Sequence, residues 1–392
     1  MTLYLDNAAT TPVRPEAVEA MLPFWTQNYG NPSSHHEVGE RAARALADAR
    51  SRVAAILGMR AGDVIFTSGG TEGNNLAIKG IALGARQRDP ARNLVVSTPI
   101  EHESVLESVA ALERLHGFTA LRVAVDETAR VDPDAVAAAL DDAPNSAALV
   151  SIGYANNEVG TVQDVARIAE VTRERGVPLH LDAVQAAGWL PLSGLGADAL
   201  TIAGHKVGAP KGTGAVAVRG RVPLEPLFHG GGQERGRRSG TEDVAGAVGL
   251  ATALELAEAE RAESARRVAA LRDAFVGRVL ALVPSARLTG HPIARLPGTA
   301  SFTFEATSGE SVLLELERRG IVSSSGSACA AGSDEPSHVL LAMGIAPEVA
   351  QTSVRFTFPH DAGGFGAVAP DAVALADAVS ASVAAVRDLR RR

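Results

Sequence analysis

The chain has 392 residues, a formal net charge of −8 and 46% hydrophobic residues, an ordinary balance for a globular protein large enough for two domains. The acidic balance gives no reason to expect nucleic acid or an anionic membrane as a partner. No apolar run approaches the ~18 residues of a membrane span, and the N-terminus lacks a basic region followed by an apolar run. We therefore expect a cytoplasmic protein.

Two residue types are scarce. Cys329 is the single cysteine, so no internal disulfide can form and a reducing compartment is expected. Of the 37 basic residues only Lys79, Lys206 and Lys211 are lysines, and a codon bias toward arginine accounts for the depletion. Arginine cannot lose its proton in a protein, whereas lysine can become a nucleophilic amine. If the chemistry requires such an amine, only three candidates remain.

Short β-branched runs alternate with helical patterns over the first two thirds of the chain, which predicts a mainly parallel sheet covered by helices on both faces. The predicted strands are Val64–Thr67, Leu94–Ser97, Leu121–Val125, Leu149–Ile152, Val177–Leu181, Ala199–Ile202 and Ala215–Val218. The last two are too close together for a helical crossover, so we expect an antiparallel return between them.

The remainder of the chain predicts a smaller α+β part. A helical pattern runs from Glu242 to Leu282, as two helices or one long bent helix. The elements expected after it are strands at Thr299–Phe304 and Val354–Phe358 and helices at Glu310–Arg319, Pro336–Met343 and Pro370–Leu389. We expect a large domain over residues 13–255 and a small domain over residues 256–392 that also takes in residues 1–12.

Polar residues follow the ends of several predicted strands, where ligands of open α/β sheets bind. The glycine-rich turn from Thr67 to Glu72 opens a helix and offers amides to a phosphate, although most such turns are only turns. Asp182 can cap the next helix or hold a pyridinium nitrogen protonated. His102 can stack on a heteroaromatic ring or move protons, and Asn157 can donate a hydrogen bond or simply occupy a turn.

The three lysines differ in their surroundings. Lys206 comes just past a strand end, after Gly204 and His205, whereas Lys79 lies on a helical face and Lys211 in a loop. Lys206 is therefore the best candidate for a Schiff-base lysine. A solvated loop lysine is the commoner role for such a residue, but five strand ends that carry five pocket-type residues favour a shared site.

Taken together, these residues and their order resemble the cysteine desulfurases. This family belongs to the fold-type I, aspartate aminotransferase-like enzymes that use pyridoxal 5′-phosphate. The resemblance extends from Leu5 to about Phe356. Its motifs are Asp6–Pro12, Gly30–Ser34, Thr67–Glu72, Glu101–His102, Asn156–Gly160, His180–Gln185, Gly204–Lys206, Gly230–Arg235, Arg238–Thr241 and Ser324–Cys329. The Gly-His-Lys and Gly-Ser-Ala-Cys segments are the most specific of them.

The resemblance implies a role for each matching residue. Lys206 matches the lysine that binds the cofactor and moves the Cα proton, and Cys329 the cysteine that carries a persulfide. Asp182 matches the acid that pairs with the pyridine nitrogen of the cofactor, and His102 matches the histidine that stacks on its ring. Gln185 and Asn157 match partners of the phenolic oxygen, and Asn157 and Arg355 match residues that bind the substrate carboxylate. Gly70, Thr71 and His205 match residues that contact the phosphate. Thr241 matches a phosphate contact from the second subunit of a homodimer. No metal is expected.

Cys329 also supports this role by its own surroundings. A lone cysteine is usually a buried small hydrophobe, but Cys329 lies in a run of serine, glycine and alanine from Ser323 to Ser333 that offers little to pack. Such a loop suits a thiolate that moves between a pocket and an outside acceptor.

The sequence departs from the family at Ala203, where a serine commonly contacts the phosphate; the hydroxyl of Thr201 is a candidate replacement. The expected reaction converts L-cysteine to L-alanine and a persulfide for an acceptor protein in iron–sulfur cluster assembly, cofactor synthesis or tRNA thiolation. Three alternatives remain open: a selenocysteine lyase, a small-amino-acid aminotransferase on the same fold, and a non-enzymatic sulfur-relay partner.

Overall fold

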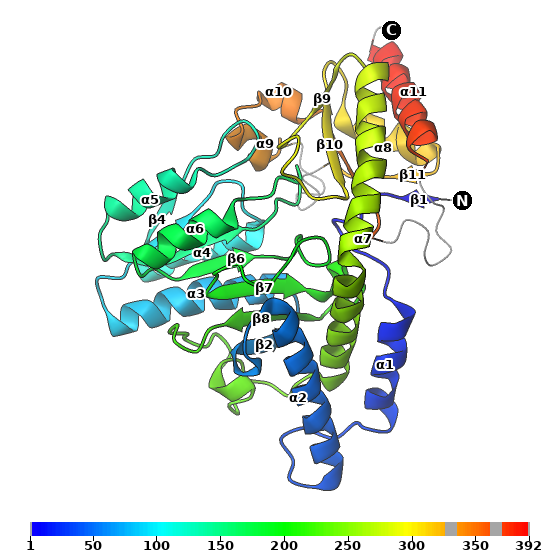
Figure 1. Ribbon diagram of the computed structural model, residues 1–392. Helices are drawn as coiled ribbons and strands as arrows, with labels where there is room; N and C mark the ends of the chain where they lie inside the picture. Colours follow the sequence, from blue (N-terminus) through cyan, green and yellow to red (C-terminus); the bar gives the residue numbers. More distant parts are fainter. Residues whose placement is uncertain (1, 326–334, 361–370, 391–392) are drawn as a thin grey trace.

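The computed structural model describes residues 2–325, 335–360 and 371–390, and Cys329 lies outside them. The described chain forms one large sheet with helices on both faces and a smaller sheet to one side of it (Figure 1). One long helix, α7 (Val244–Leu282), runs past both parts, so that its first half packs on the large part and its second half on the small part. None of the described helices is long and apolar enough to cross a membrane.

The large sheet has seven strands in the order β2-β8-β7-β6-β5-β3-β4. These strands are β2 (Val64–Thr67), β3 (Leu94–Ser97), β4 (Thr119–Arg122), β5 (Ala147–Gly153), β6 (Leu179–Asp182), β7 (Ala199–Ala203) and β8 (Gly214–Val218). Strand β8 runs in the opposite direction to the other six strands of this sheet, which all run the same way. The chain therefore leaves β2, β3, β5, β6 and β7 at the same edge of the sheet.

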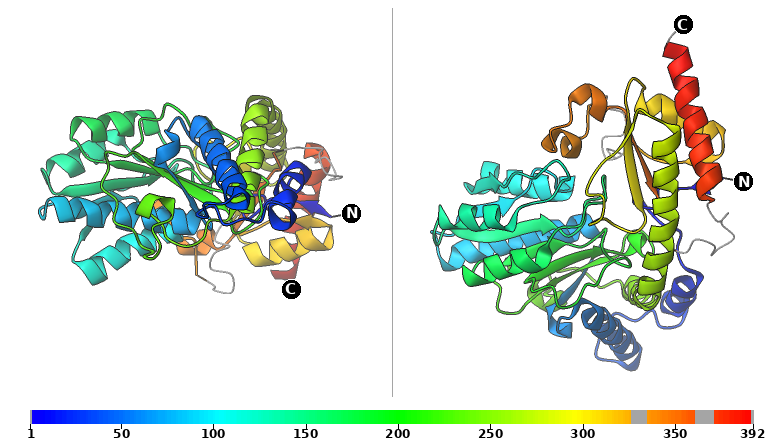
Figure 2. Two further views of the ribbon diagram at one scale, coloured as in Figure 1. Left: turned by 90° about the horizontal axis from the view of Figure 1, so that it is seen from below. Right: turned by 45° about the horizontal axis from the view of Figure 1, so that its top comes forward.

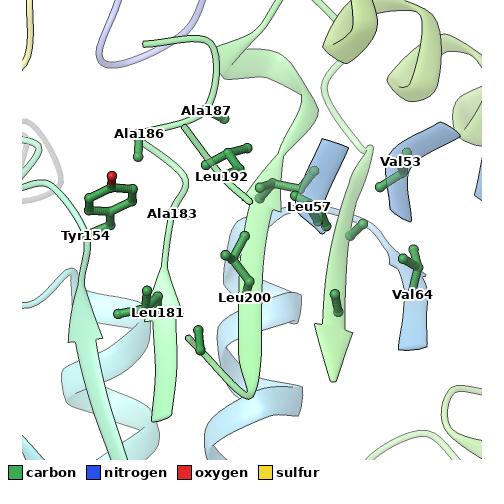
Figure 3. Close-up of a cluster of buried hydrophobic side chains, with 14 of the residues drawn as sticks. Val53, Leu57, Val64, Tyr154, Leu181, Ala183, Ala186, Ala187, Leu192 and Leu200 are labelled. Carbon is green, nitrogen blue, oxygen red and sulfur yellow. The ribbon is translucent and has the colours of Figure 1, made fainter. Parts of the chain in front are cut away.

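Helices cover both faces of this sheet because its strands are apolar on both sides. One face is covered by α3 (Gly70–Arg88) and α4 (Glu103–His116). The other is covered by α2 (Glu37–Leu57), α5 (Pro133–Asp141), α6 (Val165–Glu174) and the first half of α7. Figure 3 shows part of this second core, in which Leu57 of α2 and Leu200 of β7 belong to the same cluster. Helix α1 (Pro15–Thr26) packs along α7.

The smaller part is built on a three-stranded antiparallel sheet, β12-β10-β9. Its elements are β9 (Ala286–Leu288), β10 (Thr299–Phe304), α8 (Gly309–Arg318), α9 (His338–Ala342), α10 (Pro347–Ala350), β12 (Ser353–Thr357) and α11 (Ala372–Arg390). Phe275 of α7 meets the rings of Phe302, Phe356 and Phe358 edge-on. The right-hand view of Figure 2 shows α7 and α11 side by side next to this sheet.

The N-terminal residues join the smaller part. Strand β1 (Leu3–Tyr4) pairs in parallel with β11 (Ile321–Val322), and Leu5 is fully buried among the phenylalanines of the small core. Three 3₁₀ turns, η1 (Ala61–Asp63), η2 (Gly204–Lys206) and η3 (Glu234–Gly236), complete the described elements.

The predicted fold class is confirmed, including the antiparallel return from β7 to β8. Two expectations about elements need correction. The strand placed at Leu121–Val125 begins earlier, as β4 at Thr119, because Leu94 of β3 pairs with Thr119. Asp182 is the last residue of β6 and does not follow it. Of the two possibilities stated for the helical region after Glu242, the structure has the single long helix α7.

Candidate active site

A cavity of about 450 Å³ opens at the edge of the large sheet where the parallel strands end. Its wall contains most of the residues that the sequence singled out: Gly70, Thr71, His102, Asn157, Asp182, Gln185, His205, Lys206 and Arg355. They come from six separate segments of the chain, and the parallel topology of the large sheet brings five of these to one edge. Arg355 is the member from the small sheet, since it lies on β12.

One predicted residue of the described chain, Thr241, is not in this wall. It lines a smaller hollow of about 170 Å³ with Ser68, Gly212 and Arg238. Cys329 lies outside the described residues.

Asp182 sits at the floor of the cavity with its carboxylate held from two sides. Oδ2 accepts a hydrogen bond from Asn74 Nδ2 (2.7 Å) and Oδ1 accepts one from the Val184 amide (3.0 Å). Asp182 is 9% exposed, so these two donors replace most of its water. Each oxygen keeps a further lone pair for a donor in the cavity.

The first turn of α3 forms an anion site on the neighbouring wall. Gly69, at φ +154°, precedes the helix, and a Cβ on Gly214 would lie 2.6 Å from its Cα, so this close approach requires glycine. The amides of Gly70 and Thr71 belong to the first turn of the helix, where N–H groups and the helix dipole favour an anion.

His205 lies beside this turn as a neutral side chain. Burial, and then the nearby Lys206, lower the pKa of His205 to about 4. Its Nδ1 is 3.2 Å from Thr10 Oγ1. At neutral pH His205 therefore offers a hydrogen bond to an anion without a formal charge.

Thr201 does not replace the missing hydroxyl of position 203. The side chain of Thr201 is fully buried, and its Oγ1 is 2.9 Å from Nε2 of His180, whose other nitrogen is 2.9 Å from Ser151 Oγ. Burial lowers the pKa of His180 to about 4, so this is a neutral chain of hydrogen bonds under the sheet edge. Ala203, by contrast, lines the cavity next to Gly70.

His102 is fixed by the helix it begins. It is the N-cap of α4, and its Nδ1 accepts the Ser104 amide (3.0 Å). When the ring is neutral its proton therefore lies on Nε2. The preceding residue, Glu101, is 4% exposed and also lines the cavity. Burial raises the pKa of Glu101 to about 8, with a further upward contribution from Asp182.

The two cationic side chains of the wall are held by main-chain carbonyls. Lys206 Nζ donates to the carbonyls of Ala8 and Ala9, the latter at 2.8 Å. Arg355 donates from Nη1 to the Asn157 carbonyl (2.8 Å) and from Nη2 to Asp6 Oδ1 (2.8 Å). The segment that precedes α1 thus contacts both cations.

Several wall residues were missed by sequence reasoning. Asn74 lies one turn inside α3 and is 1% exposed, and a buried amide in an otherwise apolar helix stripe is the signal that would have found it. Asn156 accepts the amides of Glu158 and Val159 (both 2.9 Å) and so shapes the turn that carries Asn157. The family motif marks Glu101 only as the residue before His102.

Comparison with known proteins agrees with this geometry. The aminotransferase class-V family model matches residues 3–362. A cysteine desulfurase IscS of Methanosarcina thermophila is 46% identical over 91% of this chain and 86% of its own length. A solved NifS-like protein has a TM-score of 0.85 at 33% identity, with 100% of both chains covered. A solved structure of SspA in complex with cysteine has a TM-score of 0.78 at 34% identity, and the match covers 91% of this chain and 99% of that one.

The family model thus matches nearly the whole chain, and the Methanosarcina relative is 46% identical over 357 residues. The matched residues include all seven strands of the large sheet, at whose edge the cavity opens. The chain therefore belongs to the aminotransferase class-V family and, within it, to the cysteine desulfurases.

Proposed function

We propose that this desulfurase binds pyridoxal 5′-phosphate in the cavity at the sheet edge and uses it to move the sulfur of L-cysteine to Cys329. Enzymes of this family depend on that cofactor. The observation that carries the proposal is the convergence of Lys206, Asp182, His102 and the first turn of α3 on one cavity of about 450 Å³.

The donors and acceptors of the wall match the cofactor group by group. The first turn of α3 with Thr71, and the neutral His205, suit a phosphate. The oriented carboxylate of Asp182 suits a protonated ring nitrogen, and the ring of His102 suits the face of the heterocycle. Lys206 supplies the amine that joins the aldehyde. Gln185 and Asn157 are the proposed partners of the phenolic oxygen.

When bound, the cofactor supplies an electron sink for charge that develops at the substrate Cα. Asp182 holds a proton on the ring nitrogen through a carboxylate oxygen, which keeps that sink effective. Arg355 binds the substrate carboxylate in a two-pronged contact, and Asp6 and the Asn157 carbonyl orient its guanidinium. Lys206 takes the Cα proton at Nζ and returns a proton to carbon.

Cys329 accepts the sulfur. Its thiolate attacks the substrate sulfur, so an S–S bond forms while the substrate Cβ–S bond breaks and its electron pair stays with carbon. The proton that the thiol loses is balanced by a proton gained at carbon. The products are L-alanine and a persulfide on Cys329. A cytoplasmic location, where this thiol stays reduced, remains a prediction.

The proposed function also involves a second subunit and a protein that accepts the sulfur. We propose a homodimer in which Thr241 contacts the phosphate in the cavity of the partner subunit, since Thr241 lies outside the cavity wall of its own chain. An acceptor protein then takes the sulfur from Cys329. Iron–sulfur assembly, cofactor synthesis and tRNA thiolation are the proposed destinations.

The products of L-cysteine test this function. The purified protein loaded with cofactor, given L-cysteine and a thiol reductant, should form L-alanine and sulfide in equal amounts. A keto acid with an aminated cofactor would mean an aminotransferase instead. A protein that turns over selenocysteine but not cysteine would mean a selenocysteine lyase, and no product from either would mean a relay protein.

A further inference from the structure

The turn that precedes α1 crosses the active site between the small sheet and Lys206. The segment from Asp6 to Thr11, called the strap below, has no strand or helix of its own beyond the single bridge from Asp6 to Thr357. A tight turn opens it, with the Ala9 amide donating to the Asp6 carbonyl (3.0 Å). The carbonyls of the last two residues of this turn, Ala8 and Ala9, are the acceptors of Lys206 Nζ.

The strap is attached to the small sheet through Thr357 of β12. The Thr357 hydroxyl accepts the Ala8 amide (2.9 Å), and the Thr357 carbonyl accepts Asn7 Nδ2 (2.7 Å). Thr357 is 4% exposed, so without its hydroxyl the Ala8 amide would be left buried and unpaired. The amide and the carbonyl of Ala8 therefore link Thr357 directly to Lys206.

The same strap reaches other groups of the site. Gln185 Nε2 donates to the Ala8 carbonyl (3.0 Å), and Thr11 Oγ1 donates to the His205 carbonyl (2.9 Å). At its start, Asp6 forms an ion pair with Arg355 (2.8 Å), which lies two residues before Thr357 on the same face of β12. One strand of the small sheet thus sets both the arginine and the strap.

We propose that the carbonyls of Ala8 and Ala9 form a docking station that holds the Lys206 amine whenever it is not joined to cofactor or substrate, and that Thr357 is the positioning residue that fixes this station. Two carbonyl oxygens accept hydrogen bonds from the amine and hold it at one place in the cavity wall, which also contains Asp182 and Gln185. The amine released when substrate binds is then held close to the bond it must act on. The inference rests on the proposed function only in taking Lys206 as the working amine.

The scarcity of lysine provides a direct test. The full-length chain without cofactor is treated briefly with an amine-acylating reagent, and the label on Lys206, Lys79 and Lys211 is quantified by mass spectrometry. Lys211 is exposed and serves as the internal reference. In Thr357→Val, labelling of Lys206 relative to Lys211 should rise about fivefold, the factor expected for one net hydrogen bond. Thr357→Ser keeps the hydroxyl and should label like the wild type.

Thr303→Val is the matched control. Thr303 is a buried threonine on β10 of the same sheet, paired with Ser353, and it lies outside both the strap contacts and the cavity wall among the described residues. It should leave the labelling ratio unchanged, which separates loss of the station from general loosening of the sheet. With cofactor, Thr357→Val should lower kcat at least about fivefold while the KM for L-cysteine changes little, because Arg355 remains in place.

An unchanged labelling ratio in Thr357→Val would overturn the proposal, as would an equal rise in Thr303→Val. Failure of the proposed function is seen separately, as a wild type that forms no alanine from L-cysteine. The labelling ratio does not depend on that reaction, so the two failures are distinguishable.

Discussion

At the scale of single residues, two features of the cavity wall stand out: Ala203 stands where the family commonly has a serine, and Glu101 is a buried acid. Ala203 lies beside Gly70 at the anion site, where a Cβ built on Gly70 would be 3.4 Å from the Cβ of Ala203. Thr201 is engaged with His180 and cannot serve in its place. In the proposed function, the phosphate of the cofactor would therefore be bound by the helix amides, Thr71 and the neutral His205.

A serine at position 203 should strengthen cofactor binding. One added donor to the phosphate is worth about 1 kcal/mol, or roughly a fivefold lower dissociation constant. We expect this gain in Ala203→Ser, measured by equilibrium dialysis of pyridoxal phosphate. Ala203→Val adds bulk without a donor and should bind more weakly. Equal or weaker binding by the serine variant would show that another group already satisfies the phosphate at this place.

Glu101 is a buried acid that should hold its proton at neutral pH. Thr98 Oγ1 lies 2.6 Å from its Oε1, and the Gly153 amide donates to the carboxyl from β5. The titratable groups that face it are Asp182 on β6 and His102 at the start of α4. Because the pKa of Glu101 is about 8 in the folded chain and near 4.5 when unfolded, the folded state binds the extra proton between these values.

Stability should therefore fall as pH rises from about 5 to about 8, by up to a few kcal/mol, since one unit of pKa difference is about 1.4 kcal/mol. Glu101→Gln cannot ionise and should lack this loss. Urea unfolding of both proteins at pH 5.5 and 8.5, followed by tryptophan fluorescence, measures the difference. The assignment would be contradicted if the free energy of unfolding changed equally with pH in the two proteins, or if the wild type became more stable relative to the variant as pH rises.

At the scale of elements, strands could be predicted more readily than the contacts between segments. The run from Val177 to Leu181 is apolar apart from His180, and this composition predicts a central strand with Asp182 at its carboxyl end; all four residues of β6 are buried. The contact of Asn74 with Asp182 joins residues 108 positions apart. No periodic pattern within either segment encodes such a contact, so it required the fold.

The strap illustrates the same limit more strongly. Residues 6–11 have no apolar period, and their role arises from partners more than 170 residues away, at Gln185, Lys206 and Thr357. The family motif over Asp6–Pro12 marked the segment without indicating what it contacts. The helix α2 is the opposite case, since its apolar stripe and the left-handed Gly58 that ends it are local features.

The segment that carries Thr241 depends on a buried ion pair between elements. Arg50 of α2 contacts Glu234 of η3 through two bonds, at 2.5 and 3.0 Å, and Arg50 and Glu234 are 8% and 4% exposed. Glu234 and Arg235 both have φ near the left-handed region, at 50° and 60°. The ion pair therefore holds a strained turn in place at the start of the segment that leads to Thr241.

Removing either Arg50 or Glu234 alone should destabilise the folded chain, because the remaining charge stays buried without a partner. We expect Glu234→Ala to lower the free energy of unfolding by about 3–5 kcal/mol. The double variant Arg50→Met with Glu234→Ala removes both charges and should be less destabilised than the single variant. Urea unfolding of the two variants compares them, and a double variant at least as unstable as the single one would exclude a stranded charge as the cause.

At the scale of the whole molecule, the position of Thr241 argues for shared sites. Its hollow contains Ser68 and Arg238, and Arg238 is tied to Glu72 (2.8 Å), the residue after Thr71 in the first turn of α3. Thr241 thus lies with Ser68 in a hollow separate from the cavity that Gly70 and Thr71 line, which is consistent with the proposal that it serves a second chain.

Mixing two defective proteins tests this arrangement. Lys206→Ala chains lack the proposed working amine, and Thr241→Val chains lack the hydroxyl proposed to contact the phosphate. If sites are shared as proposed, one site of a mixed dimer receives Lys206 from one chain and Thr241 from the other, so that site is intact. Cofactor affinity and turnover should be restored in part on mixing and refolding, and analytical ultracentrifugation should show a dimer. A fully active monomer, or no gain on mixing, would contradict the shared site.

The central claim is that sulfur passes to Cys329, which lies outside the described residues, and one comparison tests it most directly. Wild type and Cys329→Ala are loaded with cofactor and given L-cysteine while alanine and the visible spectrum are recorded. Because the cavity wall is intact in the variant, its spectrum should still change on adding substrate, but alanine formation should fall by orders of magnitude. Near-equal rates of alanine formation in the two proteins would contradict the persulfide mechanism.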